Sequence, residues 1–257
     1  MNYRIKIYLI LSLMIEYNIH PEKAGIIMLS DADIKKTRYL VSLRENHYNE
    51  GIRNMDLSGV DLSGGDLHGM QIVDTNFDRA ILDNANLYDT RLIGCRFNET
   101  GFRRAIVRKS DIIDCEFNGA RLSQADMSES KLYNLTFNEC DLHLVKLTGA
   151  RVVDCFFKGC NLLSAGLSTA NITGSTFDNC DMQYANGEHS FIASNTFYNV
   201  KMNHVSLNYA LVYGNKFEKV TTDDMLLVET RMDEDPLLFR NARAVDLKNI
   251  SSGKRQK

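Results

Sequence analysis

A hydrophobic residue recurs at every fifth position from Ile52 to Phe217, and this period constrains the fold more than any other feature of the chain. Of the 34 positions in the series, 33 are Ile, Leu, Val, Met or Phe, and Gly187 is the exception. A helix repeats about every 3.6 residues and a strand about every 2, so neither explains the pattern. The period predicts a coil that turns a corner every five residues and points this side chain inward.

Two further regularities support the coil. The residue two positions before each large one is mostly small, as in Ala80, Ala85, Thr90, Cys95, Thr100, Ala105 and Ser110, and forms a second inward column. Phenylalanine recurs every 20 residues at Phe77, Phe97, Phe117, Phe137, Phe157, Phe177, Phe197 and Phe217. Four pentapeptides therefore make one turn, with one ladder of stacked rings. Nine such coils at about 4.8 Å each predict a rod of about 43 Å.

These repeats resemble the pentapeptide-repeat family, whose consensus is A-(D/N)-L-x-x. The motif stands here as A-N-L-Y-D at 85–89, A-D-M-S-E at 125–129, C-N-L-L-S at 160–164 and A-N-I-T-G at 170–174. The resemblance covers about 70% of the chain. It implies an all-β, right-handed, four-sided β-helix of about nine coils, and it leaves the function open because one fold serves many functions.

The repeat divides the chain into three parts. Residues 1–50 are expected to form a helical cap, with Pro21 at a helix start, because an open sheet edge needs cover. Residues 51–235 form the β-helix. Residues 236–257 hold Leu237, Leu238 and Phe239, which predict a short cap helix or a dimerisation element, followed by a basic tail. The pattern does not separate the cap from the dimer.

The apolar run at residues 7–15 is too short for a helix that spans a bilayer. It predicts a buried N-terminal helix, with the core of a signal peptide as the alternative. No other segment predicts a membrane span. We expect the protein in a bacterial cytoplasm, or secreted from there into a host cell.

Charge is distributed unevenly. Residues 51–235 hold 17 Lys and Arg against 26 Asp and Glu, whereas residues 236–257 hold 6 against 1. The acidic body argues against direct nucleic-acid binding by the repeats, since phosphate binding needs a positive face. The basic tail is expected to be solvated, with an anionic partner as the alternative.

The sequence predicts no enzyme, no cofactor and no metal site. All six cysteines fall in the small inward column, where reduced thiols pack as small apolar groups. His68, His143, His189 and His204 lie at scattered outward positions without a convergent acid or nucleophile. Asn195 and Asn215 predict an asparagine ladder inside the rod. Gly187 predicts local repacking by Leu167 and Leu207, or else a notch where a partner docks.

Two groups of charged residues are candidates for partner binding. The first is a cationic cluster within about one coil, formed by Arg91, Arg96, Arg103, Arg104, Arg108 and Lys109. Ion pairs to neighbouring coils are the competing explanation, and such pairs contribute little to stability. The second group consists of the outward carboxylates Asp61, Asp126 and Asp181.

The prediction for function is a non-enzymatic protein that binds another macromolecule. The resemblance implies two versions of it. In the first, the chain is a bacterial effector that acts on a host protein. In the second, the acidic rod mimics DNA, binds DNA gyrase or topoisomerase IV and protects against quinolones, with a homodimer through residues 236–250. A regulatory module that acts with another domain in trans is a third version.

Overall fold

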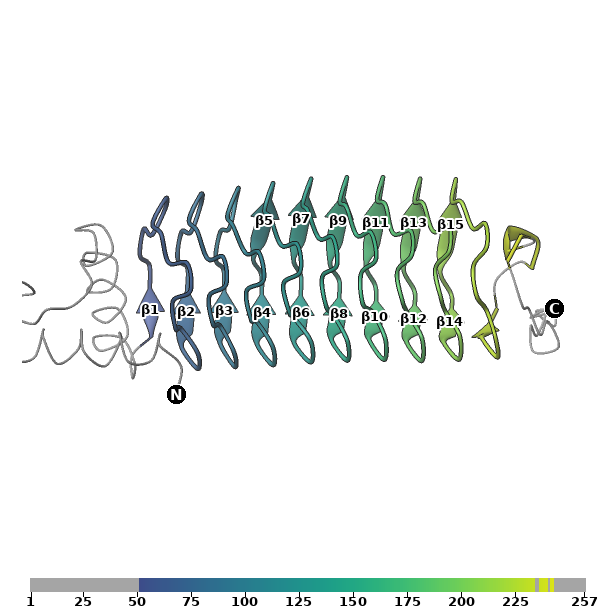
Figure 1. Cartoon of the computed structure of the whole chain (residues 1–257), viewed down its shortest axis with the longest axis horizontal. Coiled ribbons are helices and arrows are strands. Elements are labelled where there is room, and N and C mark those ends of the chain that lie inside the picture. Colours follow the sequence, from purple (N-terminus) through teal and green to yellow (C-terminus); the bar gives the residue numbers. More distant parts are fainter. Residues whose placement is uncertain (1–50, 234–235, 240, 243–257) are drawn as a thin grey trace, which may run out of the picture. The chain divides into compact units, whose positions relative to one another are not determined.

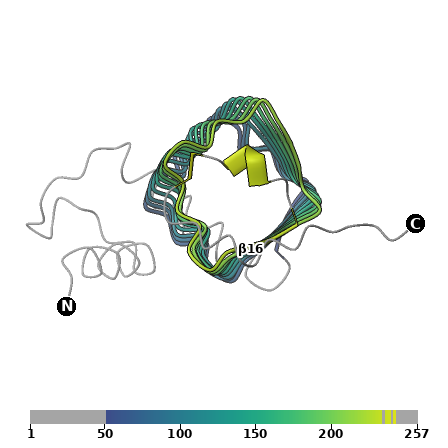
Figure 2. The ribbon, with the colours of Figure 1, turned by 90° about the vertical axis from the view of Figure 1, so that its right-hand side faces the viewer.

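The computed structural model describes residues 51–233, 236–239 and 241–242. Over these residues the chain forms a parallel β-helix of about nine coils (Figure 1). Seen along the rod axis, the coils superimpose on a four-sided outline (Figure 2). The predicted all-β solenoid is therefore confirmed, and the helical cap predicted for residues 1–50 lies outside the described residues.

Each side of the outline is one pentapeptide, and we number the sides by their central buried residues. Face 1 is centred on Ile52, Ile72 and every twentieth residue to Met232, and face 2 on Leu57, Phe77 and every twentieth residue to Phe217. Face 3 begins at Leu62 and face 4 at Leu67. A residue on one coil pairs with the residue 20 positions further on, as in Ile72↔Leu92.

Faces 1 and 2 carry the regular strands. Face 1 is a ten-stranded parallel sheet of β1 (Ile52–Arg53), β2 (Gln71–Val73), β3 (Arg91–Ile93), β4 (Asp111–Ile113), β6 (Lys131–Tyr133), β8 (Arg151–Val153), β10 (Asn171–Thr173), β12 (Phe191–Ala193), β14 (Leu211–Tyr213) and β16 (Arg231–Met232). Face 2 is a six-stranded sheet of β5 (Glu116–Asn118), β7 (Thr136–Asn138), β9 (Phe156–Lys158), β11 (Thr176–Asp178), β13 (Thr196–Tyr198) and β15 (Lys216–Glu218). On faces 3 and 4, successive coils are joined by isolated β-bridges such as Asp61↔Ile81.

The interior is filled by the two inward columns. The phenylalanine ladder runs under face 2, where the ring of Phe157 lies 4.7 Å from those of Phe137 and Phe177, with interplanar angles of 2° and 1°. Offset stacking at this spacing adds to the free energy gained by burial. The coil spacing of the sheet therefore sets the spacing of the rings.

At the corner between faces 1 and 2 the small column holds polar side chains and thiols on most coils, with the apolar Leu135 among them, and several of these side chains bond to backbone amides. At the corner between faces 3 and 4 the amide of the small residue bonds within its own turn, as Ala85 N does to Leu82 O at 3.0 Å. At the corner between faces 1 and 2, several of these amides donate to a side chain of the next coil instead. Ser175 N donates to Asn195 Oδ1 at 2.8 Å, and Asn195 N donates to Asn215 Oδ1 at 3.0 Å. The predicted asparagine ladder is confirmed.

Gly187 opens no docking notch. A Cβ on this residue would lie 2.8 Å from Leu207 Cδ2 and 3.4 Å from Ser190 Oγ, so neighbouring side chains occupy the space. The prediction of local repacking by Leu207 is confirmed, and the alternative of a docking notch is wrong.

At the C-terminal end the structure describes the 3-10 helix η2 (Pro236–Phe239), and residues 240 and 243–257 of the predicted cap segment lie outside the described residues. Figure 2 shows η2 within the outline of the rod. Phe239 is buried and meets the last ring of the ladder, Phe217, edge-on at 5.8 Å. Thr222 Oγ1 donates to Leu238 O at 2.7 Å, which holds the turn in place. Phe239 therefore packs on the end of the core, and the dimer through residues 236–250 stays a prediction. The side chain of Leu237 lies outside the described residues.

The last residue before each corner takes a left-handed backbone, which favours Gly, Asn and Asp. Thr169 adopts it with φ 57° although it is β-branched and exposed. We expect Thr169→Gly to raise the free energy of unfolding by about 1 kcal/mol, measured by urea denaturation. Thr148, one coil earlier and outside the left-handed region, is the control. Thr148→Gly is expected to lower the same free energy by about 0.5–1 kcal/mol, so a loss in both variants would contradict the prediction.

Candidate interaction surface

The described residues show no candidate metal centre. They contain no cluster of three or more His, Cys, Asp or Glu side chains that could hold a metal ion. Within the same ranges no helix is long and apolar enough to cross a membrane. A recess of about 230 Å³ lies where faces 2 and 3 meet, lined among others by Asp181, Lys201 and Lys219. Lys201 pairs with Asp181 at 3.5 Å and Lys219 donates to Tyr198 Oη at 2.8 Å, so both amines are engaged.

The cationic cluster of the sequence does not form one patch. One coil places Arg91 on face 1, Arg96 on face 2, Arg103 and Arg104 on face 3, and Arg108 and Lys109 on face 4. Four of these side chains bond to neighbouring coils. Arg108 pairs with Glu129 at 2.6 Å and Lys109 with the same carboxylate at 3.7 Å. Arg96 lies 3.5 Å from Asp78, and Arg104 Nε donates to Gln124 at 3.1 Å. The hydrogen bond from Arg108 holds the pKa of Glu129 below its ordinary value.

The three candidate carboxylates are also separated. Asp61 and Asp181 lie on face 3, six coils apart, and Asp126 lies on face 4. Each accepts a hydrogen bond from the backbone amide two residues later, at 2.9 Å for Asp61, 3.1 Å for Asp126 and 3.2 Å for Asp181. These side chains stabilise their own turns. The structure brings no acidic patch together from them.

The cysteines are buried and unpaired by disulfides. Cys140, Cys160 and Cys180 lie on successive coils, and their thiols donate to the carbonyls of Phe117, Phe137 and Phe157. Burial raises the pKa of Cys155 to about 12, and the hydrogen bond with Cys140 is the first cause that raises the pKa of Cys160 to about 12. Protonated thiols of this kind are poor nucleophiles, which agrees with the packing role that the sequence predicts.

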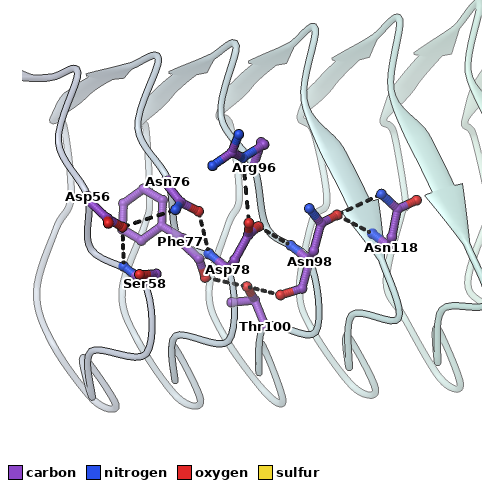
Figure 3. A network of polar contacts seen from close by, with 9 residues as sticks. All are labelled: Asp56, Ser58, Asn76, Phe77, Asp78, Arg96, Asn98, Thr100 and Asn118. Carbon is purple, nitrogen blue, oxygen red and sulfur yellow. Dashed lines mark hydrogen bonds and ion pairs between the residues drawn. The ribbon is translucent and has the colours of Figure 1, made fainter.

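The outer surface of face 2 is a polar ladder along the rod (Figure 3). Asp56 accepts from Asn76 Nδ2 at 3.0 Å, and Asp78 accepts from the amide of Asn98 at 3.0 Å. Asn98 Oδ1 in turn accepts from Asn118 Nδ2 at 2.7 Å. Because these polar groups bond to one another, they stabilise the stacking of the coils. Their presence on face 2 is therefore explained without a binding partner.

Face 1 differs from face 2 at the same strand positions. The outward residue after each central one is apolar on most coils and forms a column that we call the apolar column: Val73, Ile93, Ile113, Tyr133, Val153, Thr173, Ala193 and Tyr213. Ala193 is buried and the others are half-buried. The corresponding positions of the face 2 strands hold Asn118, Asn138, Lys158, Asp178, Tyr198 and Glu218. Strand propensity alone would act on both sheets, so it does not explain the contrast.

The apolar column widens towards the C-terminal end of the rod. There the outward residue before the centre is also apolar, at Phe191 and Leu211, each 37% exposed. Phe191 pairs with Leu211 across β12 and β14. Contiguous exposed apolar surface of this kind marks interaction sites. The inward period of five does not reveal the apolar column; the outward residue followed at a period of 20 does.

Comparison with known proteins agrees with this architecture. Residues 110–186 match the family model described as "Pentapeptide repeat region", and residues 66–99 match "Pentapeptide repeats (8 copies)". No curated protein sequence matches the chain. The coil geometry defines a four-sided parallel β-solenoid. Over these matched residues the chain consists of pentapeptide repeats.

Several solved structures are similar to the chain. QnrB1, described as a plasmid-mediated fluoroquinolone resistance protein, is 16% identical over 74% of this chain and 98% of its own, with a TM-score of 0.41. HetL, described as involved in heterocyst differentiation regulation in the cyanobacterium Nostoc sp. strain PCC 7120, is 22% identical over 69% and 86%, with a TM-score of 0.28. Rfr23 from the cyanobacterium Cyanothece 51142 is 13% identical over 54% and 95%, with a TM-score of 0.37. None of them assigns a partner to this chain.

Proposed function

We propose that this chain is a non-enzymatic protein-binding rod and that face 1 is its contact surface. The observation that carries the proposal is the apolar column, which leaves seven half-buried side chains along one side of a rigid sheet. A protein partner that covered them would gain the free energy of removing apolar surface from water. A stiff rod loses little conformational entropy on binding, which favours a preformed surface of this kind.

The cellular setting that we propose is a bacterial cytoplasm or, after secretion, the cytoplasm of a host cell. Six reduced cysteines support a reducing compartment, because disulfides form and persist mainly in oxidising ones.

The charge of the rod is too small to support mimicry of DNA as well as the apolar column supports a protein partner. Residues 51–235 carry a net charge of −9 over nine coils. A DNA duplex of the same length, about 43 Å, carries about 25 phosphate charges. The candidate carboxylates also lie on different faces and serve their own turns. We therefore place the protein partner on face 1 and keep gyrase as an outcome of the test.

The test is affinity capture with the full chain and two matched variants. The face 1 variant combines Ile113→Asn and Val153→Lys, which are the residue types that face 2 carries at the corresponding Asn118 and Lys158. We expect the captured partner to fall at least about tenfold, because two apolar contacts are removed from the interface. Circular dichroism and thermal melting confirm that the variant remains folded.

The control variant combines Lys158→Asn and Asp178→Asn on face 2, which preserves net charge and uses the residue already present at Asn118 and Asn138. It is expected to capture the partner as the unmodified chain does. Equal loss from both variants would contradict the assignment to face 1. Inhibition of gyrase supercoiling by the face 1 variant and the unmodified chain alike would instead support DNA mimicry.

A further inference from the structure

We infer that the segment bound on face 1 is an amphipathic α-helix that lies along the rod axis, with basic residues on one flank and acidic residues on the other. This inference rests on the proposed function and adds the chemistry and direction of the partner. The structure supports it through the spacing of the apolar column, the pairing of the backbone and the charges beside the column.

The spacing of the column suits a helix. Successive members lie one coil apart, which is about 4.8 Å. One turn of an α-helix advances about 5.4 Å, so side chains three or four residues apart on a helix meet successive members of the column. The mismatch of about 0.6 Å per turn is small enough for several consecutive contacts. An extended strand advances about 3.3 Å per residue and does not match this spacing.

The backbone of face 1 offers no place for an added strand along most of its length. The inner strands of the sheet pair on both sides, as β8 does with β6 and β10. β-Strand addition needs an exposed sheet edge with unpaired amides and carbonyls. A ligand on the surface of face 1 must therefore bind through side chains, and a helix presents an apolar stripe for that purpose.

One edge of the apolar column is basic. The outward residues before the centre are Arg91, Lys131 and Arg151 on β3, β6 and β8, with Asp111 on β4 between the first two. Lys131 pairs with Asp111 at 2.8 Å. Among the described residues, neither Arg91 nor Arg151 has a carboxylate within ion-pair distance. These two guanidinium groups can form ion pairs with acidic side chains of a partner.

The other edge is acidic at regular intervals. Asp74, Asp114 and Asp154 occupy the left-handed corner position after the column, with φ of 48°, 55° and 53°. They lie two coils apart, which is about 9.6 Å. Seven residues of a helix advance about 10.5 Å, so one basic residue per heptad meets each carboxylate within the reach of a lysine or arginine side chain. In the described ranges Asp74 and Asp154 have no ion pair to a cation.

A second copy of the chain is the alternative occupant of this surface. The flanking side chains of a helix reach both charged edges. We therefore commit to a helix from another protein.

The experiment measures the binding of three stapled helical peptides to the full chain by fluorescence anisotropy. Each has about 21 residues, enough for about 31 Å of helix, and the same leucine stripe. The first has lysine on one flank and glutamate on the other, the second lysine on both, and the third glutamate on both. We expect the mixed peptide to bind about tenfold more tightly than either uniform peptide at low salt, and to lose binding with Ile113→Asn and Val153→Lys.

A charge reversal tests the geometry. Asp114→Lys with Asp154→Lys makes both edges of the column basic, and we expect the preferred ligand to change from the mixed peptide to the glutamate peptide. Lysine is compatible with this backbone, since Lys109 and Lys219 adopt it with φ of 58° and 56°. The matched control is Glu99→Lys with Glu139→Lys, which occupy the same pentapeptide position on face 2. This control is expected to leave the preference for the mixed peptide unchanged.

Several outcomes would overturn the inference. Equal binding of the lysine peptide would indicate non-specific attraction to an acidic rod, and an equal shift in the face 2 control would remove the role of face 1. A dimer of the full chain in sedimentation that Ile113→Asn and Val153→Lys dissociate would make a second copy the occupant. If no peptide binds while the face 1 variant still loses its captured partner, the helix is wrong and the proposed function stands.

Discussion

Replacement of Phe157 by alanine is expected to lower the free energy of unfolding by about 3–5 kcal/mol. The ring is 2% exposed and lies between those of Phe137 and Phe177, each 4.7 Å away. Neighbouring coils are held by backbone hydrogen bonds at a set spacing, so they cannot collapse into the space left by the ring. The cost therefore includes both the lost burial and the cavity.

Phe156 provides the control from the adjacent position of β9. Its side chain points outward from face 2 and is 37% exposed. We expect Phe156→Ala to change the free energy of unfolding by about 0.5 kcal/mol or less. Because the chain has no tryptophan, urea denaturation is followed by far-ultraviolet circular dichroism. Similar losses in the two variants would contradict the assignment of the period-20 phenylalanines to the core.

The second large effect is a loss of stability at alkaline pH that depends on three buried thiols. Burial raises the pKa of Cys155 to about 12, the hydrogen bond with Cys140 leads the causes that raise the pKa of Cys160 to about 12, and the hydrogen bond with Cys160 raises that of Cys180. An unfolded thiol titrates near about 8.5. A raised pKa in the folded state gives stability that is complete below about pH 8.5 and is lost as the pH rises towards 12.

The expected size follows from the same shifts. A thiol costs about 1.4 kcal/mol per pH unit above its unfolded pKa, so at pH 10 Cys155 by itself removes about 2 kcal/mol, and the hydrogen-bonded thiols Cys160 and Cys180 add to this loss. A variant with Cys155→Ala, Cys160→Ala and Cys180→Ala should lose the part of the dependence that comes from these thiols, while Cys115, whose pKa is also raised, contributes equally to both proteins. Alanine already occupies the small column at Ala120, Ala150 and Ala170, so the variant is expected to fold.

The measurement compares urea denaturation of the two proteins from pH 7 to pH 10 with a reductant present. Tyrosine and lysine titrate in both proteins, so their contribution cancels in the difference. The difference in the free energy of unfolding should shift in favour of the variant as the pH rises. If the free energy of unfolding changed with pH in the same way for both proteins, the folded structure would not raise the pKa of these thiols.

The repeat predicted most of the fold because each pentapeptide makes its own contribution to the same coil. The inward residues Ile72 to Val212 and the ladder Phe77 to Phe217 recur without a shift of frame, and the structure places them all inward on faces 1 and 2. The apolar residues Leu237, Leu238 and Phe239 did not by themselves distinguish a cap from a dimer contact, because an apolar side chain suits either role. The contact of Phe239 with Phe217 is made only when the last coil is in place.

The candidate site was less predictable than the fold. The cationic cluster from Arg91 to Lys109 is close in sequence, yet a coil of 20 residues distributes it over four faces. The apolar column has the opposite character, since its members lie 20 residues apart and meet only through the coil. In a solenoid, residues one coil apart in the sequence lie side by side, whereas residues that follow one another spread around the coil. A cluster in the sequence is therefore a poor guide to a surface patch, and a column along the rod is easily missed.

The amino-acid sequence by itself determined the coil, its four sides, the filling of the interior and the reduced thiols within it, because these depend on a local pattern repeated every five and every 20 residues. The tertiary structure decided which outward residues stand together, that Phe239 covers the end of the core, and that several backbone amides at the corner between faces 1 and 2 donate to side chains of the next coil. These outcomes depend on contacts between coils, and only the stacked rod brings those residues within reach of one another.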